Sequence, residues 1–125
     1  MELLHREVTD KIIRSFFEVY NYLGYGFLEK VYENSLVKEF LEIGLQFQNQ
    51  KSLFVNYKGS EVGIYVTDFI VEDSVIVEVK ACSCILEEHE FQLINYLKAT
   101  NIEVGLLLNF GKKPEFKRKV FTNKK

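Results

Sequence analysis

The chain has 125 residues, of which 47% are hydrophobic and 27% are charged. This length and composition predict a single domain over residues 1–125 with one core. The formal charge of −2 is weak evidence against a nucleic-acid-binding protein, which normally has a basic surface. Residues 111–125 nevertheless carry a net charge of +6, so the remainder carries −8. Such a basic end is more often a solvated terminus than a phosphate-binding segment.

The cysteines and apolar runs exclude several other classes of protein. Cys82 and Cys84 lie too close together for an ordinary disulfide framework, and two histidines are too few for a zinc cage. No apolar stretch approaches the ~20 residues that a membrane helix needs, and the first residues do not resemble a signal peptide. We therefore expect a cytoplasmic protein that does not associate with membranes.

Two helices are predicted first. Apolar residues at three- and four-residue spacing predict one helix over residues 8–23 and a second over about 28–43. Gly24-Tyr25-Gly26 separates them, and Gly44 is a natural helix end. Glu29 lies in the first turn of the second helix, where an acid often only interacts with the helix dipole.

A meander of strands is predicted next, over residues 47–57, 62–71 and 75–81, with breaks at 58–60 and 72–74. Helical spacing returns over 87–100, and an apolar strand follows at 104–110. Residues 116–121 are a weaker candidate for a short edge strand. The order α-α-β-β-β-α-β indicates an α/β fold in which helices flank a sheet, rather than a strictly alternating doubly wound sheet.

The strand over 75–81 breaks its own apolar pattern with Glu78 and Lys80. Ionised groups are rarely buried unless they are paired or bound to a metal. Because side chains alternate along a strand, these two point to the same face. An isolated Glu-x-Lys triplet is more often a cross-strand ion pair than a catalytic site, so the interpretation depends on neighbouring residues.

The length of the preceding hairpin loop decides where Asp68 points. A three-residue loop at 72–74 pairs Val71 with Val75 and places Asp68 opposite Glu78, with Cβ atoms ~5 Å apart. A two-residue loop would pair Asp68 with Val77 and move Glu78 to the other face. The three-residue register is favoured because it collects the apolar residues of both strands on one face: Phe69, Val71, Val75, Val77 and Val79.

Two adjacent carboxylates repel each other unless a divalent cation lies between them. Oxygen ligands suit Mg²⁺ or Mn²⁺ better than zinc. Such an ion lowers the pKa of its bound water and neutralises charge on a phosphate, while Lys80 orients that water or stabilises the developing charge. The pattern therefore points to hydrolysis of phosphodiester bonds.

Two further segments add to this pattern. Gln92 and Tyr96, four residues apart, share one face of the helix predicted over 87–100, although such a pair is more often only a polar helix edge. Tyr22, Tyr25 and Tyr57 lie near breaks between elements and are candidates for stacking on bases.

Together, these segments resemble the GxxExxY family, which is assigned to the PD-(D/E)xK nuclease superfamily. The resemblance covers about residues 9–121, and its ordered combination is more specific than any one motif. The matching residues are Gly26, Glu29, Tyr32, Asp68, Glu78, Lys80, Gln92 and Tyr96. The resemblance implies a restriction-endonuclease-like mixed β-sheet flanked by helices, with the acids on a central hairpin.

The resemblance also implies roles for individual residues. Asp68, Glu78 and the Val79 carbonyl would bind the metal, and Glu29 would bind it directly or through water. Lys80 would be the catalytic lysine. The side chain of Gln92 would hold the active site or a substrate phosphate, and that of Tyr96 would support it; the implied catalytic and substrate-binding residues are then Glu29, Asp68, Glu78, Lys80, Gln92 and Tyr96.

The expected function is that of a Mg²⁺- or Mn²⁺-dependent nuclease whose partner is a nucleic acid, with DNA favoured over RNA. The alternative is a catalytically inactive module of the same fold that binds nucleic acid or a protein partner. A homodimer would let so small a domain span a duplex, although no sequence feature indicates one.

Overall fold

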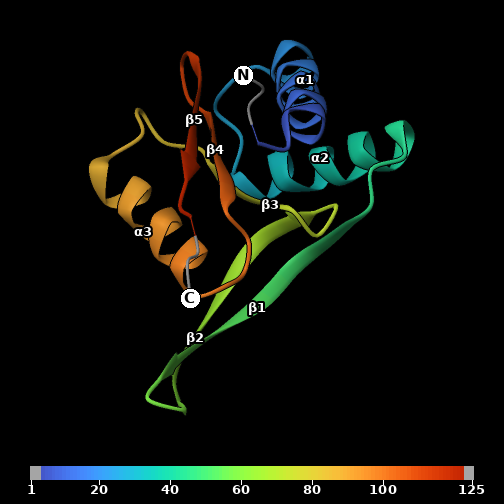
Figure 1. The fold of residues 1–125 in the computed structure, drawn as a ribbon. Helices are drawn as coiled ribbons and strands as arrows, with labels where there is room; N and C mark the ends of the chain where they lie inside the picture. The colour runs from blue at the N-terminus through green and yellow to red at the C-terminus, as the bar shows by residue number, and fades with distance from the viewer. Residues whose placement is uncertain (1–3, 123–125) are drawn as a thin grey trace.

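The computed structural model describes residues 4–122, so Lys124 and Lys125 of the basic end lie outside the described residues. Helices α1 and α2 come first, and α3 connects the third and fourth of five strands (Figure 1). The elements are α1 (Arg6–Leu23), α2 (Glu29–Ile43), β1 (Phe47–Tyr57), β2 (Ser60–Val71), β3 (Val75–Lys80), α3 (Glu87–Lys98), β4 (Val104–Phe110) and β5 (Pro114–Val120).

The five strands form one mixed sheet in the order β1-β2-β3-β4-β5. Neighbouring strands are antiparallel except for β3 and β4, which are parallel and joined by the crossover helix α3. This arrangement confirms the predicted α/β class and element order, and it is consistent with a restriction-endonuclease-like fold. Strand β5 confirms the weaker prediction of an edge strand.

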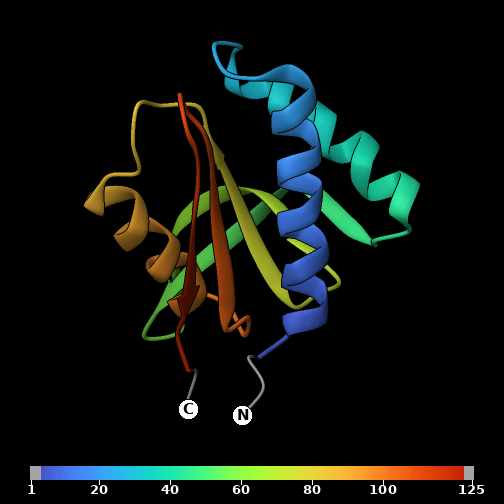
Figure 2. The ribbon, with the colours of Figure 1, turned by 90° about the horizontal axis from the view of Figure 1, so that it is seen from above.

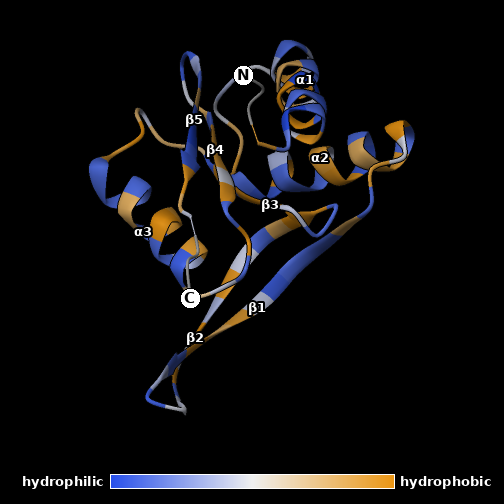
Figure 3. Cartoon of the chain, viewed as in Figure 1, coloured by the Kyte–Doolittle hydropathy of each residue, from blue (hydrophilic) through white to orange (hydrophobic). Residues whose placement is uncertain are grey.

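The sheet is covered on both faces (Figure 2). Helices α1 and α2 pack on one face around a core that includes Phe16, Phe40 and Val77. Helix α3 packs on the other face, where Ile76 and Leu93 belong to a smaller core. In Figure 3 the apolar stripes of the helices face the strands, as the three- and four-residue spacing predicts.

Four predicted boundaries were wrong by two residues, including the starts of α1, at Arg6 rather than residue 8, and of β5, at Pro114 rather than residue 116. Strand β2 begins at Ser60 rather than at residue 62, because Lys58 and Gly59 form a two-residue turn with φ values of 50° and 81°. This turn lets Ser60 pair with Tyr57 at once. Helix α3 ends at Lys98 rather than at residue 100, where the Thr100 hydroxyl donates to the Tyr96 carbonyl.

Strands β1 and β2 extend beyond the sheet as a two-stranded ribbon (Figure 1), because β2 pairs with β3 only over residues 69–71. The ribbon twists strongly. The Phe69 ring lies 5.2 Å from Phe40 of α2, whereas the Tyr65 ring lies 5.5 Å from Tyr96 of α3 on the other face of the sheet. Within residues 4–122, no helix is long and apolar enough to cross a membrane.

Candidate active site

The β2–β3 hairpin has the predicted three-residue loop. Val71 pairs with Val75 and Phe69 with Val77, which confirms the register that brings Asp68 next to Glu78. The regular ladder stops there, and the acid side chains bond to the backbone instead. The Asp68 N–H donates to Glu78 Oε2 at 3.3 Å, and the Val79 N–H donates to Asp68 Oδ2 at 2.7 Å.

The pair of carboxyl groups is strongly coupled. Glu78 is only 5% exposed, and this burial, together with the charge of Asp68 and a hydrogen bond to it, raises the pKa of Glu78 to about 9. Glu78 therefore keeps its proton near neutral pH in the absence of metal. A divalent cation in place of this proton would neutralise the charge of both carboxylates.

Two other predicted site residues lie in the electrostatic field of this pair. Tyr96 of α3 is buried, and desolvation, followed by the charges of Glu78 and Asp68, raises its pKa to about 12. Glu29, at the start of α2, has a raised pKa because of desolvation and the nearby acid Asp68, and Lys80 opposes this shift. Helices from both faces of the sheet thus reach the end of β3.

The remaining predicted side chains of the site are those of Lys80 and Gln92. Lys80 is half-buried at the end of β3, and Gln92 lies exposed on α3. Among residues 4–122, no group of three or more His, Cys, Asp or Glu side chains is close enough to hold a metal ion. Asp68 and Glu78 are the pair that the structure brings together.

Gln50 is a residue of this site that sequence analysis missed. It lies opposite Asp68 in strand β1 but has a left-handed backbone with φ of 57°, which interrupts the ladder. Its Nε2 donates to Glu33 Oε2 at 2.6 Å and lies 3.2 Å from Asp68 Oδ1. The amide therefore bridges two carboxylates that would otherwise repel each other. Strand alternation carries no signal of a left-handed residue, so Gln50 was not detectable in this way.

Glu33 was also missed, although a signal for it was present. It follows Glu29 by four residues, so both lie on one face of α2. Glu33 is 5% exposed and accepts hydrogen bonds from Asn49 and Gln50, and it lies 3.5 Å from the Lys30 ammonium group. Asn49 Nδ2 also donates to the Asp68 carbonyl at 2.9 Å. This network ties the start of α2 to the strand segment that carries Asp68.

The Gly26-x-x-Glu29-x-x-Tyr32 spacing has a structural explanation. Tyr32 is fully buried in α2, and its hydroxyl donates to the Gly24 carbonyl at 2.7 Å and accepts from the Phe27 N–H at 3.2 Å. Gly24 and Gly26 have positive φ values of 69° and 108°, which L side chains rarely adopt. The tyrosine therefore fixes the loop that precedes Glu29.

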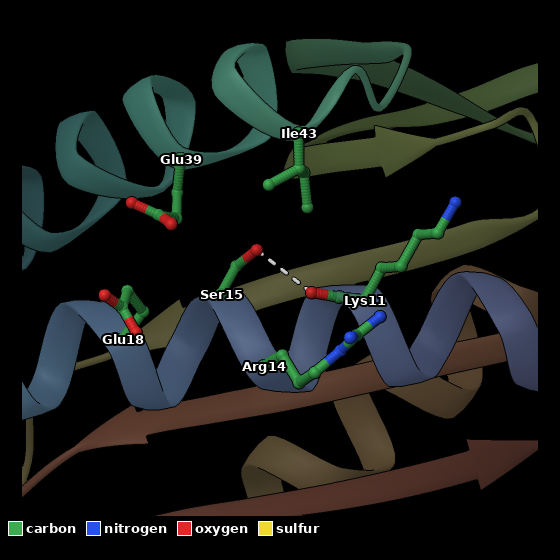
Figure 4. Close-up of a pocket in the computed structure, with 6 residues that line it drawn as sticks. All are labelled: Lys11, Arg14, Ser15, Glu18, Glu39 and Ile43. Atoms are coloured by element: carbon green, nitrogen blue, oxygen red, sulfur yellow. Dashed lines mark hydrogen bonds between the residues drawn. The ribbon is translucent and has the colours of Figure 1, made fainter.

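A different hollow, of about 310 Å³, lies between α1 and α2 (Figure 4). Its lining mixes basic and acidic side chains, including Arg14, Glu18 and Glu39. These helices cover the sheet face opposite α3, whereas Glu78 shares the α3 face with Ile76. The residues that line this hollow include none of those placed in the carboxylate site.

The donor set fits a hard divalent cation. Every donor at the pair is a carboxylate or carbonyl oxygen, which is the preference of Mg²⁺ and Mn²⁺. The raised pKa of Glu78 reflects burial first and the charge of Asp68 second, and Lys80 opposes this shift only in part.

Comparison with known proteins gave a family match and a structural match. The family model described as PD-(D/E)XK nuclease superfamily matches residues 6–119. The crystal structure of SSO0001 is similar over 94% of this chain and 68% of that chain, with 17% sequence identity and a TM-score of 0.49. No match was found among the curated proteins.

Proposed function

Because the chain belongs to the PD-(D/E)XK nuclease superfamily, we propose that it is a Mg²⁺-dependent nuclease that hydrolyses phosphodiester bonds, with DNA favoured over RNA. The observation that carries this proposal is the coupled carboxyl pair of Asp68 and Glu78, two residues before Lys80 on the same strand. Superfamily members generally use divalent metals, which suits this oxygen donor set.

Each residue has a proposed role. Asp68, Glu78 and the Val79 carbonyl hold the ion, and Glu29 contacts it through water. When bound, the ion supplies a water of lowered pKa and neutralises charge on the phosphate. Lys80 orients the attacking water, Gln92 contacts the substrate phosphate, and Tyr96 supports the carboxylates from α3. Gly26, Glu29 and Tyr32 further support assignment to the GxxExxY branch of the superfamily.

The extent of the domain, its cellular compartment and its oligomeric state are also proposed. The family match over residues 6–119 supports one nuclease domain over residues 1–125. The two free cysteines in the described part of the chain suit the cytoplasm. A homodimer would allow both strands of a duplex to be cut, and light scattering after size exclusion would test this.

The main test compares cleavage of DNA and RNA by wild type, Lys80→Ala and Glu78→Gln with Mg²⁺ or Mn²⁺. We expect both variants to lose metal-dependent cleavage by at least about a hundredfold and to remain folded, because Glu78→Gln removes a ligand of the ion and Lys80→Ala removes the group that orients the attacking water. Exposed Glu61→Gln, near the tip of the ribbon, is the matched control. Equal cleavage by all four proteins would refute the proposed active site.

A metal titration separates the enzyme from the inactive module. The enzyme requires Mn²⁺ binding, measured by calorimetry, that depends on Asp68 and Glu78. If no such binding occurs and the wild type cuts no nucleic acid, the alternative of a module that only binds a partner takes precedence.

A further inference from the structure

Residues from three loops line a recess of about 260 Å³ at one end of the sheet. The backbones of these loops are at the top of Figure 2. The loops are those between α1 and α2, between β3 and α3, and between β4 and β5. Tyr25 and Phe27 line it from the first loop, Cys82 from the second and Lys112 from the third. The proposed mechanism uses none of these four side chains.

Buried side chains hold all three loops in place. Tyr32 fixes the first loop, as described above. Asn109 is fully buried and forms two hydrogen bonds with the Cys82 backbone, at 3.0 and 2.9 Å. The Tyr20 hydroxyl lies 2.7 Å from the carbonyl oxygens of both Gly111 and Lys112, so it donates to one at a time. The recess is therefore preorganised.

The second and third loops also approach each other closely. A Cβ atom added at Gly111 would lie 2.6 Å from the Cys82 carbonyl oxygen, so only glycine allows this approach. Burial raises the pKa of the Cys82 thiol, which keeps this wall of the recess uncharged at neutral pH.

The rim of this fixed recess exposes aromatic rings. Tyr25 is 57% exposed and Phe27 is 47% exposed, although both belong to a loop whose backbone is hydrogen-bonded. An exposed aromatic ring offers a face on which any nucleobase can stack. Lys112 adds a positive charge at the same rim, and Lys113 follows it, in a molecule that is otherwise acidic.

The recess adjoins the carboxylate site along the chain. Leu28 separates Phe27 from Glu29, and Ala81, which also lines the recess, directly follows Lys80. The thiol of Cys82 lies within the electrostatic field of both Lys80 and Glu29. A strand whose phosphate lay at Asp68 and Glu78 would therefore bring a neighbouring nucleotide to the recess.

We propose that this recess is a nucleotide subsite that takes one base of a single nucleic-acid strand, with Tyr25 and Phe27 stacking on the base and Lys112 facing the phosphate backbone. This inference rests on the proposed function, because the carboxylate site sets where the strand lies. A paired base is stacked on both sides within a duplex, so the subsite selects single-stranded or locally opened substrates.

The experiment measures fluorescence anisotropy of a labelled oligothymidine in EDTA, so that binding is separated from cleavage. Tyr25→Ala with Phe27→Ala should weaken binding by about 5- to 150-fold, the range expected for losing one stacked base. Phe54→Ala is the matched control, because this ring is 49% exposed but lies in strand β1 of the ribbon. It should bind like wild type.

A second series moves one abasic position along the oligonucleotide. At one position, the missing base should weaken binding by wild type but have little further effect on the Tyr25 and Phe27 variant, because both changes remove the same stack. No binding by wild type, equal binding by the variant, or equal abasic losses in both proteins would overturn the subsite. If Glu78→Gln loses cleavage but still binds the abasic oligonucleotide more weakly than the intact one, binding at the subsite does not depend on catalysis. This result would separate the catalytic proposal from this one.

Discussion

Glu78 is the residue whose protonation links the site to stability. Its pKa rises from an ordinary 4.5 to about 9 in the folded protein, so the folded state keeps a proton that the unfolded chain releases above pH 4.5. Without metal, the free energy of unfolding should therefore fall as the pH rises from about 5 to 9, by at most about 1.4 kcal/mol per pH unit.

Urea denaturation at pH 6, 7 and 8 in EDTA measures this dependence. Glu78→Gln is neutral at every pH and its amide can still donate to Asp68, so we expect it to lose the slope and to be more stable than wild type at pH 8. Exposed Glu61→Gln should keep the wild-type slope. A wild-type slope that matches that of Glu78→Gln would contradict the buried, protonated carboxyl group.

Gln50 combines backbone strain with a bridging amide. Left-handed backbone at a non-glycine residue costs roughly 1 kcal/mol, so Gln50→Gly should be about 1 kcal/mol more stable than Gln50→Ala. At exposed Gln48, in ordinary strand backbone, the order should reverse, because glycine weakens a strand. Both Gln50 variants should also bind Mn²⁺ more weakly than wild type, as they lose the bridge to Asp68. Denaturation and calorimetry test the two parts, and the same order at both positions would rule out the strain.

These residues show what local patterns can predict. The Asp68–Glu78 pairing followed from parity and loop length, because both residues belong to one local hairpin. Gln50 reaches the site through a long-range contact at a ribbon twist that no periodicity describes, and the only signal for Glu33 was its four-residue spacing from Glu29. A sequence with no aligned relatives carries no direct signal of such contacts.

At the scale of elements, α3 depends on a close approach to β4. A Cβ atom at Gly105 would lie 2.7 Å from Leu93 Cδ1, and Leu93 is fully buried. Gly105→Ala should therefore destabilise the protein by about 1–3 kcal/mol, because the helix must move away from the sheet. Gly63→Ala, with nothing within 4 Å, should change stability by less than about 0.5 kcal/mol. Equal denaturation midpoints for the two variants would disprove this packing constraint.

Some features of the helices and strands were also predictable from the sequence, and others were not. The helices, the meander and β4 were predictable because their apolar faces are continuous, and β4 is buried along its whole length. The start of β2 was missed because Lys58 and Gly59 make a tighter turn than the composition of the break indicated. The extension of the ribbon beyond the sheet depends on how few residues of β2 pair with β3, which is a property of the assembled sheet.

For the whole molecule, metal binding should raise the free energy of unfolding. An ion held only by the folded state at 100 times its Kd adds ~2.7 kcal/mol to the free energy of unfolding. For a chain of this size that corresponds to a Tm increase of roughly 10 °C. Differential scanning calorimetry with and without Mn²⁺ should show this increase for wild type and for Asp10→Asn, an exposed acid of α1. Asp68→Asn should not show it; an unchanged increase would place the ion elsewhere.

The two turns that flank β2 differ in their tolerance of insertions and deletions. Adding one residue at 72–74 would shift the β2–β3 register and move Glu78 to the other face of its strand. Adding residues at Lys58 and Gly59 would alter only the tip of the ribbon, far along the strand from Asp68. Among metal-binding descendants of a common ancestor, length variation should therefore accumulate at the turn of Lys58 and Gly59, and the loop at 72–74 should keep its three residues.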